Sequence, residues 1–202
     1  MDIDLSLHSA SERYHMLTQA VIPRPVAWIL TQDETGITNL APYSFFAPVC
    51  SEPPTLVVSI GHKPDGNEKD TFNNLKASGR CVLQIASVAF AAPLNLTSAT
   101  LAAGQSEADE FGIELQTVPG WSLPVVAGIP VAFLCRYQQQ VDLGPGNQHV
   151  VFLEAERLYL KDGLAEATER LTIASEDIDP LARLGAAEYA ALGQRMKIRR
   201  PQ

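Results

Sequence analysis

Short apolar segments separated by turn residues make up the first part of the chain. Residues 26–31 are almost all apolar, which is typical of a strand buried on both faces. Asp33–Gly36 has the composition of a hairpin turn and precedes a predicted return strand at residues 37–41. Further strands are predicted over residues 55–60 and 81–86. Strands of this length and spacing favour a barrel or a sandwich over a parallel nucleotide-binding sheet.

Three segments carry the signals of helices. Residues 9–19 place apolar side chains at roughly helical spacing before two prolines stop the pattern. Residues 70–79 are predicted as a helix with Asp70 as its N-cap and Gly79 just past its end. A third helix is predicted over residues 179–190, where a proline can occupy the first turn and leucines form one stripe.

The second half of the chain combines a helical region with a long hairpin. Residues 87–112 are rich in alanine but interrupted by proline and glycine, so we expect short helices that cross outside the strands. Val131–Val141 alternates between apolar and polar residues, which predicts a strand with Tyr137 and Val141 on the same face. Residues 149–161 are predicted to pair with it.

Composition and charge narrow the class of protein. The 202 residues, 46% hydrophobic and 19% charged, predict one folded domain spanning residues 1–202. The net charge of −8 argues against a nucleic-acid partner, and no apolar run is long enough to predict a membrane helix. The acidic N-terminus does not resemble a signal peptide, so the three cysteines are predicted to be reduced thiols in the cytoplasm. Because the cysteines lack paired spacing, no zinc site is predicted.

Residues 39–46 hold the most distinctive local composition, because small and hydroxylated residues stand directly beside aromatic ones. Ala41 and Pro42 would let a ligand approach the backbone closely, and Asn39 and Ser44 offer hydrogen-bonding groups. A plain core strand does not need this mixture. The segment is typical of a site for a flat ring with polar edges, and our hypothesis is a flavin.

Other candidate residues allow two interpretations each. Lys69 and Thr71 at the start of a predicted helix form a natural seat for a phosphate, but from the residues alone an ordinary capped surface helix with an exposed lysine is the simpler interpretation. Arg24, between two prolines, is either a functional residue or a solvated loop arginine. His149 follows the loop residues Gly146 and Asn147, where it can lie near a site or be purely structural.

Motifs for other chemistries are missing from the sequence. There is no GxGxxG, no GxxxxGK[ST] and no GxSxG, and no serine, histidine and acid are ordered as a triad. The acidic stretch Glu107–Glu110 is interpreted as solvated charge. The sequence therefore predicts a site that binds a reactive group, rather than one whose own side chains do difficult chemistry.

Several segments together carry a resemblance to a known family. They are Arg24–Thr31, Asn39–Phe46, Pro53–Pro54, Ser59–Ile60, Lys69–Thr71, and Ala182–Gly185 with Tyr189. In this order they resemble the flavin reductase-like FMN-binding split-barrel family. The resemblance implies a mainly β fold with peripheral helices, a Greek-key split β-barrel, and a homodimer with flavin near the subunit interface.

The resemblance also implies roles for individual residues. Asn39, Ala41, Tyr43 and Ser44 would follow the flavin ring and ribityl chain, and the phosphate would lie near Lys69. The complete set of implied cofactor-binding residues is Trp28, Ile29, Asn39, Ala41, Pro42, Tyr43, Ser44, Ser59, Ile60, Lys69, Thr71 and Arg183. His149 is the candidate catalytic residue, although its loop is shifted relative to the Gly-Asp-His stretch of some relatives.

The implied function is hydride transfer from NADH or NADPH to FMN, with FAD as a possible alternative cofactor. The reduced flavin would then pass electrons to a free flavin or to a partner oxygenase. An FMN-binding electron carrier without enzymatic activity uses the same fold and stays open as an alternative. So does a barrel that binds another planar ligand, such as a haem or pyridoxal phosphate.

Overall fold

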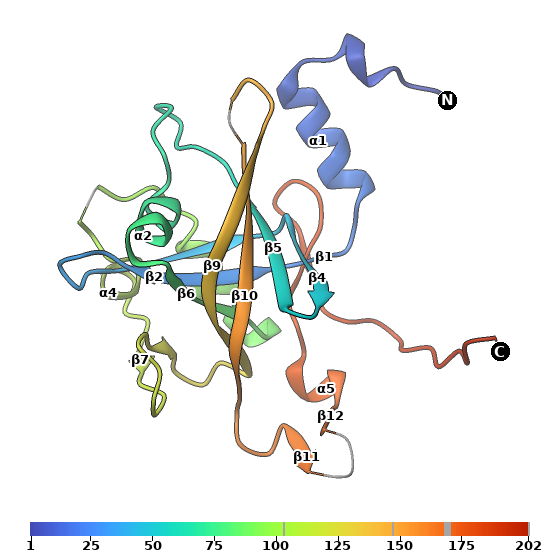
Figure 1. Ribbon diagram of the computed structural model, residues 1–202. Coiled ribbons are helices and arrows are strands. Elements are labelled where there is room, and N and C mark those ends of the chain that lie inside the picture. Colours follow the sequence, from blue (N-terminus) through green and yellow to red (C-terminus); the bar gives the residue numbers. More distant parts are fainter. Residues whose placement is uncertain (103, 147, 168–170, 202) are drawn as a thin grey trace.

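The structure is a computed structural model that describes residues 1–102, 104–146, 148–167 and 171–201. Asn147, in the loop before His149, lies outside these residues. A seven-stranded antiparallel sheet forms the centre of the molecule, in the order β3-β2-β6-β9-β10-β5-β4 (Figure 1). Its strands are β2 (Ala27–Gln32), β3 (Thr38–Tyr43), β4 (Phe46–Ser51), β5 (Pro54–Ile60), β6 (Arg80–Ile85), β9 (Val131–Leu143) and β10 (Gln148–Leu160).

The sheet curls because its two edge strands follow each other in the sequence. β3 and β4 stand at opposite ends of the strand order, yet only Ser44 and Phe45 separate them. A flat sheet could not bring these edges together over so short a connection, since strands are spaced about 4.8 Å apart. The N–H of Ser59 on β5 donates to the carbonyl of Phe45 at 2.9 Å, which holds the bend against the sheet.

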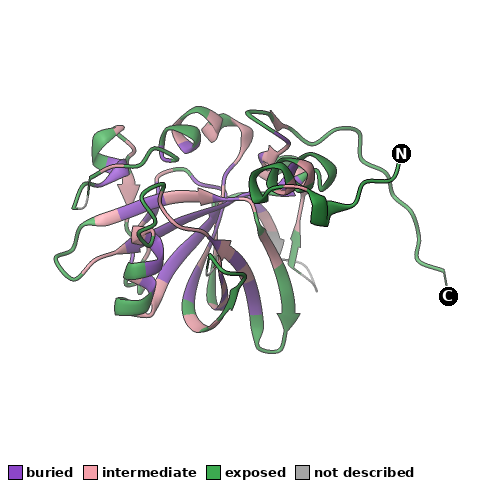
Figure 2. Ribbon diagram, turned by 90° about the horizontal axis from the view of Figure 1, so that it is seen from above, coloured by how far each residue is buried: buried purple, intermediate pink, exposed green. Residues whose placement is uncertain are grey.

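The curled sheet contributes to two cores, and alternate residues of β2, β6 and β9 lie in different ones. Ile29 and Leu83 lie in an inner core that α2 (Asp70–Ser78) closes with Phe72 and Leu75. Trp28 and Leu30 lie in an outer core covered by the segment that runs from β6 to β9. The burial of the strands and the exposure of the loops around them are visible in Figure 2. The prediction of a mainly β fold with peripheral helices is confirmed.

The remaining elements are short and lie around this sheet. The helices are η1 (Leu5–Leu7), α1 (Ala10–Ala20), η2 (Val88–Phe90), α3 (Ala91–Leu96), α4 (Glu107–Glu110) and α5 (Ser175–Ile178). The short strands are β1 (Arg24–Pro25), β7 (Leu115–Gln116), β8 (Val125–Val126), β11 (Ala165–Ala167), β12 (Leu171–Ile173), β13 (Ala182–Arg183) and β14 (Tyr189–Ala190). Among the described residues, no helix is long and apolar enough to span a bilayer.

The helix predicted over residues 179–190 is wrong. This segment forms β13 and β14, and β13 pairs with β1 so that Arg183 stands opposite Arg24. Asp179 adopts a left-handed conformation with φ 45°, which an α-helix cannot continue through. The backbone pairing with β1, far away in the sequence, outweighs the local helical pattern.

Two details of the strands also differ from the sequence prediction. β4 was not predicted as a strand, because Pro48 and its exposed outer residues hide the alternation. Val141 is 46% exposed instead of sharing a face with Tyr137. A register shift between β9 and β10 leaves Gln138 without a partner, and such a bulge moves the following side chains to the other face.

Candidate functional site

Two neighbouring hollows lie along β3 and are here together called the groove. The first, here called the α2 hollow, has a volume of about 460 Å³ and lies between β3, the start of α2 and residues 97–101. The second, here called the tyrosine hollow, has a volume of about 590 Å³ and is walled by Tyr14 and Tyr189. Pro42 and Ser98 line both hollows, so the two are adjacent.

The amino end of α2 opens into the α2 hollow. Lys69 is the N-cap residue, and no side chain caps the helix. The prediction that Asp70 is the N-cap is wrong, because its carboxylate instead accepts from Lys63 Nζ at 2.8 Å. An uncapped helix start leaves N–H groups for an anion, and the aligned peptide dipoles favour negative charge there.

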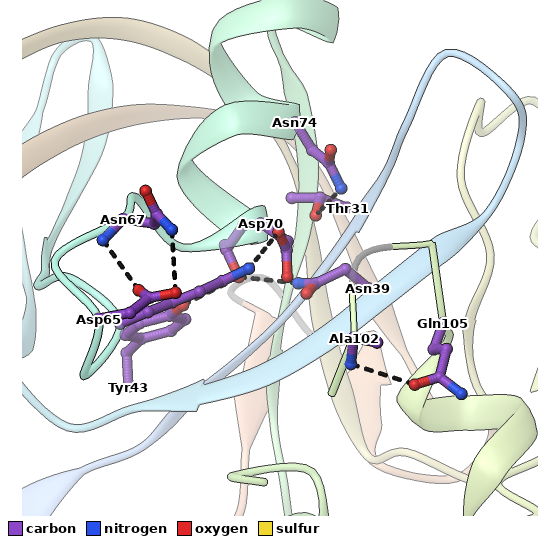
Figure 3. Close-up of polar contacts among 11 residues, drawn as sticks. Thr31, Asn39, Tyr43, Asp65, Asn67, Asp70, Asn74, Ala102 and Gln105 are labelled. Carbon is purple, nitrogen blue, oxygen red and sulfur yellow. Dashed lines mark hydrogen bonds and ion pairs between the residues drawn. The ribbon is translucent and has the colours of Figure 1, made fainter. Parts of the chain in front are cut away.

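Thr71 is the centre of a buried hydrogen-bond cluster beside this helix end. Its hydroxyl oxygen accepts from Asn39 Nδ2 at 2.8 Å and from the Tyr43 hydroxyl at 2.9 Å. Burial raises the pKa of Tyr43, so its hydroxyl stays a neutral donor. Two incoming bonds use both acceptor positions of Thr71 and leave its own O–H to donate. Asn39, Tyr43 and Asp70 are drawn together in Figure 3.

Glu107 on α4 also lines the α2 hollow, which contradicts its interpretation as solvated charge. Only 5% of the residue is exposed, and its Oε2 accepts from the N–H of Leu40 at 2.8 Å. Burial raises the pKa of this carboxyl, and the Leu40 N–H partly offsets the rise. Its neighbours Asp109 and Glu110 are exposed, as predicted. A polar helix of four residues has no apolar period that could have revealed the one buried position.

The wall of the tyrosine hollow is the C-terminal segment that was predicted to be a helix. Arg183 lies over the ring of Tyr189, with its Cζ 4.5 Å from the ring centroid. Its guanidinium donates to the carbonyls of Glu188 and Ala186. The hydroxyl of Tyr189 donates to Asn95 Oδ1 at 3.3 Å and so joins this segment to α3. The hollow therefore combines a cation with aromatic and hydroxyl groups.

Arg24 connects the elements around the tyrosine hollow. It is 6% exposed, so the solvated-loop interpretation is wrong. Its Nη1 donates to the carbonyls of Thr18 at 2.5 Å and Val21 at 2.7 Å, at the end of α1, and its Nη2 donates to Leu184 O at 2.8 Å. Nε lies 3.4 Å from Ser44 Oγ. One guanidinium thus joins α1, β1 and the C-terminal segment.

The groove brings together most, but not all, of the predicted cofactor residues. Its two hollows are lined by Asn39, Ala41, Pro42, Tyr43, Ser44, Lys69, Thr71 and Arg183. Trp28 is fully buried behind the groove and donates from Nε1 to Thr97 Oγ1 at 2.9 Å. Ile29 and Ile60 belong to the inner core. Ser59 is bonded by Gln148 and, like Ile29 and Ile60, lines neither hollow.

His149 lies away from the groove. It is 4% exposed, stacks on Phe72 with ring centroids 3.8 Å apart, and lines neither hollow. Its Nδ1 lies 2.7 Å from Asp142 Oδ1, and its Nε2 lies 3.5 Å from Glu68 Oε1. The residue thereby connects the β9–β10 hairpin to the loop that precedes α2. His149 therefore lies outside both hollows, and its role as the candidate catalytic residue stays a prediction.

Comparisons with known proteins agree with this geometry. A family model described as flavin reductase like domain matches residues 19–181. A protein of Deinococcus radiodurans is 35% identical over 186 residues, which cover 90% of this chain and 81% of the relative.

Solved structures share the fold. Nitrilotriacetate monooxygenase component B from Bacillus cereus has a TM-score of 0.90 at 28% identity, with 98% of both chains covered. A flavin reductase with a split barrel domain from Shewanella frigidimarina has a TM-score of 0.84 at 19% identity. The match covers 98% of this chain and 96% of the other, and at this identity it shows the fold alone. The predicted split-barrel fold is confirmed, and the protein belongs to the flavin reductase like domain family.

Proposed function

We propose that the protein binds FMN along the β3 groove and acts as an NAD(P)H-dependent flavin reductase. The observation that carries the proposal is the asymmetry of the groove. One end holds an uncapped helix start with Lys69 and the Thr71 hydroxyl, and the other is a wider hollow with aromatic walls. FMN has the same asymmetry, with a phosphate at one end and a flat ring at the other. Membership of the flavin reductase like family supports this assignment.

The residues present fit FMN. The phosphate would be held by Lys69, the Thr71 hydroxyl and the first N–H groups of α2. The ribityl chain would follow Ala41 and Pro42, and the ring would occupy the tyrosine hollow beside Ser44. The cation of Arg183 in this hollow would favour a ring that gains negative charge on reduction. FAD contains the same phosphate and ring, so it is the alternative cofactor.

The chain would contribute binding and orientation to the reaction. When bound, FMN supplies the redox chemistry by accepting a hydride from a reduced nicotinamide. Hydride transfer depends mainly on alignment of the two rings, so the groove needs no titrating catalytic residue. Residues 41–44 would position the ring against the backbone and leave its outer face open for the nicotinamide.

Homodimer formation and an oxygenase partner belong to the same proposal. Exposed apolar side chains gather where α1 meets the β3–β4 bend, around a hollow lined by Leu17, Val21 and Phe45. A second copy of the chain would cover this face.

The name of the Bacillus cereus neighbour describes a monooxygenase component, which supports transfer of electrons to an oxygenase. The three cysteines are free thiols, which suits the reducing cytoplasm.

Steady-state assays with added FMN test the proposed activity. The expected result is oxidation of NADH or NADPH at a rate that depends on both enzyme and flavin. FMN binding without turnover of either nucleotide would contradict the reductase and identify a flavin electron carrier instead. A protein that fails to take up FMN would contradict both.

Ser44→Leu is expected to weaken FMN binding by about tenfold or more, because a branched side chain would fill part of the tyrosine hollow. Ser44 is only partly buried, so the free energy of unfolding should change by less than about 1 kcal/mol. Fluorescence titration with FMN and urea unfolding measure the two effects. Ser51→Leu, at the exposed end of β4, is the matched control and should keep wild-type affinity. Unchanged affinity in Ser44→Leu would place the ring elsewhere.

A further inference from the structure

Glu107 is a buried carboxyl in the α2 hollow that the proposed binding scheme does not use. It is the first residue of α4 and follows the N-cap residue Ser106. The Ser106 hydroxyl accepts from the Asp109 N–H at 3.4 Å. Oε2 of Glu107 accepts from Leu40 N–H at 2.8 Å, on the free side of edge strand β3. The side chain is therefore held in place by the strand that forms the floor of the groove.

Few unpaired positive charges lie near Glu107 to balance the charge of an incoming anion. The charged and titratable groups that line the hollow or neighbour Glu107 on its own helix are Tyr43, Lys63, Lys69, Asp70, Asp109 and Glu110. Lys63 is paired with Asp70, so Lys69 is the lysine of this hollow that remains for a phosphate. A phosphate monoester carries about −1.5 to −2 charges at pH 7. A phosphate and an ionised Glu107 in one hollow would repel each other.

We propose that Glu107 takes up a proton when a phosphate-bearing flavin enters the α2 hollow, so that FMN binding is linked to proton uptake. The inference rests on the proposed function, because it requires the phosphate to lie at the amino end of α2. A nearby like charge disfavours the ionised form of a carboxyl. Ligand binding and protonation then favour each other, and FMN affinity falls as the pH rises through the range in which Glu107 ionises.

The pKa of this carboxyl is already raised by burial, with the Leu40 N–H offsetting part of the rise. The further rise caused by the phosphate therefore starts from a higher value than that of a solvated glutamate. This brings the titration of Glu107 in the complex closer to neutral pH, where FMN binding is readily measured. Riboflavin has the same ring and polyol but no phosphate, so it should not produce the effect.

Isothermal titration calorimetry between pH 6 and pH 8, in buffers with different ionisation enthalpies, tests the proposal. FMN and riboflavin are titrated into the wild type and Glu107→Gln, whose amide oxygen can still accept from Leu40. The expected result is that the ratio of wild-type to variant FMN affinity falls about three- to tenfold from pH 6 to pH 8. The ratio cancels the ionisation of the phosphate itself. Glu110→Gln, exposed on the same helix, should behave like the wild type.

The outcomes separate this inference from the proposed function. Failure of FMN to bind the wild type would contradict the proposed function. FMN binding with the same pH dependence in wild type and Glu107→Gln would overturn the inference alone, and so would an equal pH effect for riboflavin. Should the variant not fold, wild-type data at pH 7.5 decide, because the phosphate is then almost fully ionised. Net proton uptake there must come from the protein, and its absence would overturn the inference.

Discussion

Replacing both Lys69 and Thr71 by alanine is expected to lower FMN affinity about 100-fold or more, while riboflavin affinity changes by less than about threefold. Each side chain would donate a charge-assisted hydrogen bond to the phosphate, and bonds of this kind contribute about 1.5 to 3 kcal/mol. Two of them together correspond to at least a 100-fold change in the dissociation constant. Riboflavin lacks the phosphate and reports only on the rest of the groove.

The riboflavin arm is needed because Thr71 also has a structural role. Its loss leaves the donors of Asn39 and Tyr43 without their acceptor, which can loosen the groove for any ligand. Lys76→Ala removes a lysine from the last turn of the same helix, away from the hollow, and should bind FMN like the wild type. Equal losses for FMN and riboflavin would show that the phosphate binds elsewhere.

Arg24→Leu is expected to lower the free energy of unfolding by about 3 to 5 kcal/mol, because hydrogen bonds from a charged donor contribute about 1.5 to 3 kcal/mol each and several are lost together. The change removes the donors from three carbonyls, those of Thr18, Val21 and Leu184. The Thr18 bond is buried and the other two are partly buried, so the loss of their donor is costly, and leucine cannot replace it. Urea unfolding followed by circular dichroism measures the loss. Because these contacts join the walls of the tyrosine hollow, FMN affinity should fall as well.

Two further variants make the Arg24 result specific. Arg24→Lys keeps a positive charge but cannot reach all three carbonyls at once, so it should recover only part of the stability. Arg13→Leu, a partly exposed arginine on α1 whose Nη1 lies 3.5 Å from the carbonyl of Leu5, should change the free energy of unfolding by less than about 1 kcal/mol. A loss below about 1 kcal/mol in Arg24→Leu would contradict the structural role given to this residue.

The parts of the fold that the sequence predicted are those decided by local pattern. The continuous apolar run at residues 26–31 correctly indicated a strand buried on both faces, since its alternate residues enter two cores. Gly79 ends α2 in the left-handed conformation with φ 69°, as its position predicted. In both places, the chemistry of neighbouring residues is sufficient to specify the conformation.

The errors arose where contacts distant in the sequence decide the structure. The C-terminal segment has a helical pattern, but β1 offers backbone partners that only the folded chain brings close. Glu107 lies in an acidic stretch and is buried because an edge-strand N–H, 67 positions away, needs an acceptor. Arg24 likewise meets a carbonyl 160 positions away. No local pattern contains such information.

The sequence singled out the segment around which the candidate site lies, but not the full set of residues that line it. The mixture of small, polar and aromatic residues at 39–46 indicated a flavin site, and several of these residues do line the two hollows; that they hold a flavin stays a prediction. The sequence did not reveal that Ile29, Ser59 and Ile60 line neither hollow, because it does not show which face of a strand borders the site. Residues 97–101 were expected only as part of a longer segment, 89–128, that would shape substrate access, since they carry no distinctive motif.

Binding of FMN and its reduction by NADH or NADPH are tested most directly by the visible absorption spectrum of the protein loaded with FMN. The spectrum is recorded without oxygen, before and after either nucleotide is added. We expect a flavin spectrum that is altered by binding and then bleached by at least one of the two nucleotides. Bleaching should be much weaker in the Lys69→Ala, Thr71→Ala variant at an FMN concentration that saturates the wild type. A spectrum identical to that of free FMN, with no bleaching by either nucleotide, would contradict both the FMN binding and the reductase activity proposed for this protein.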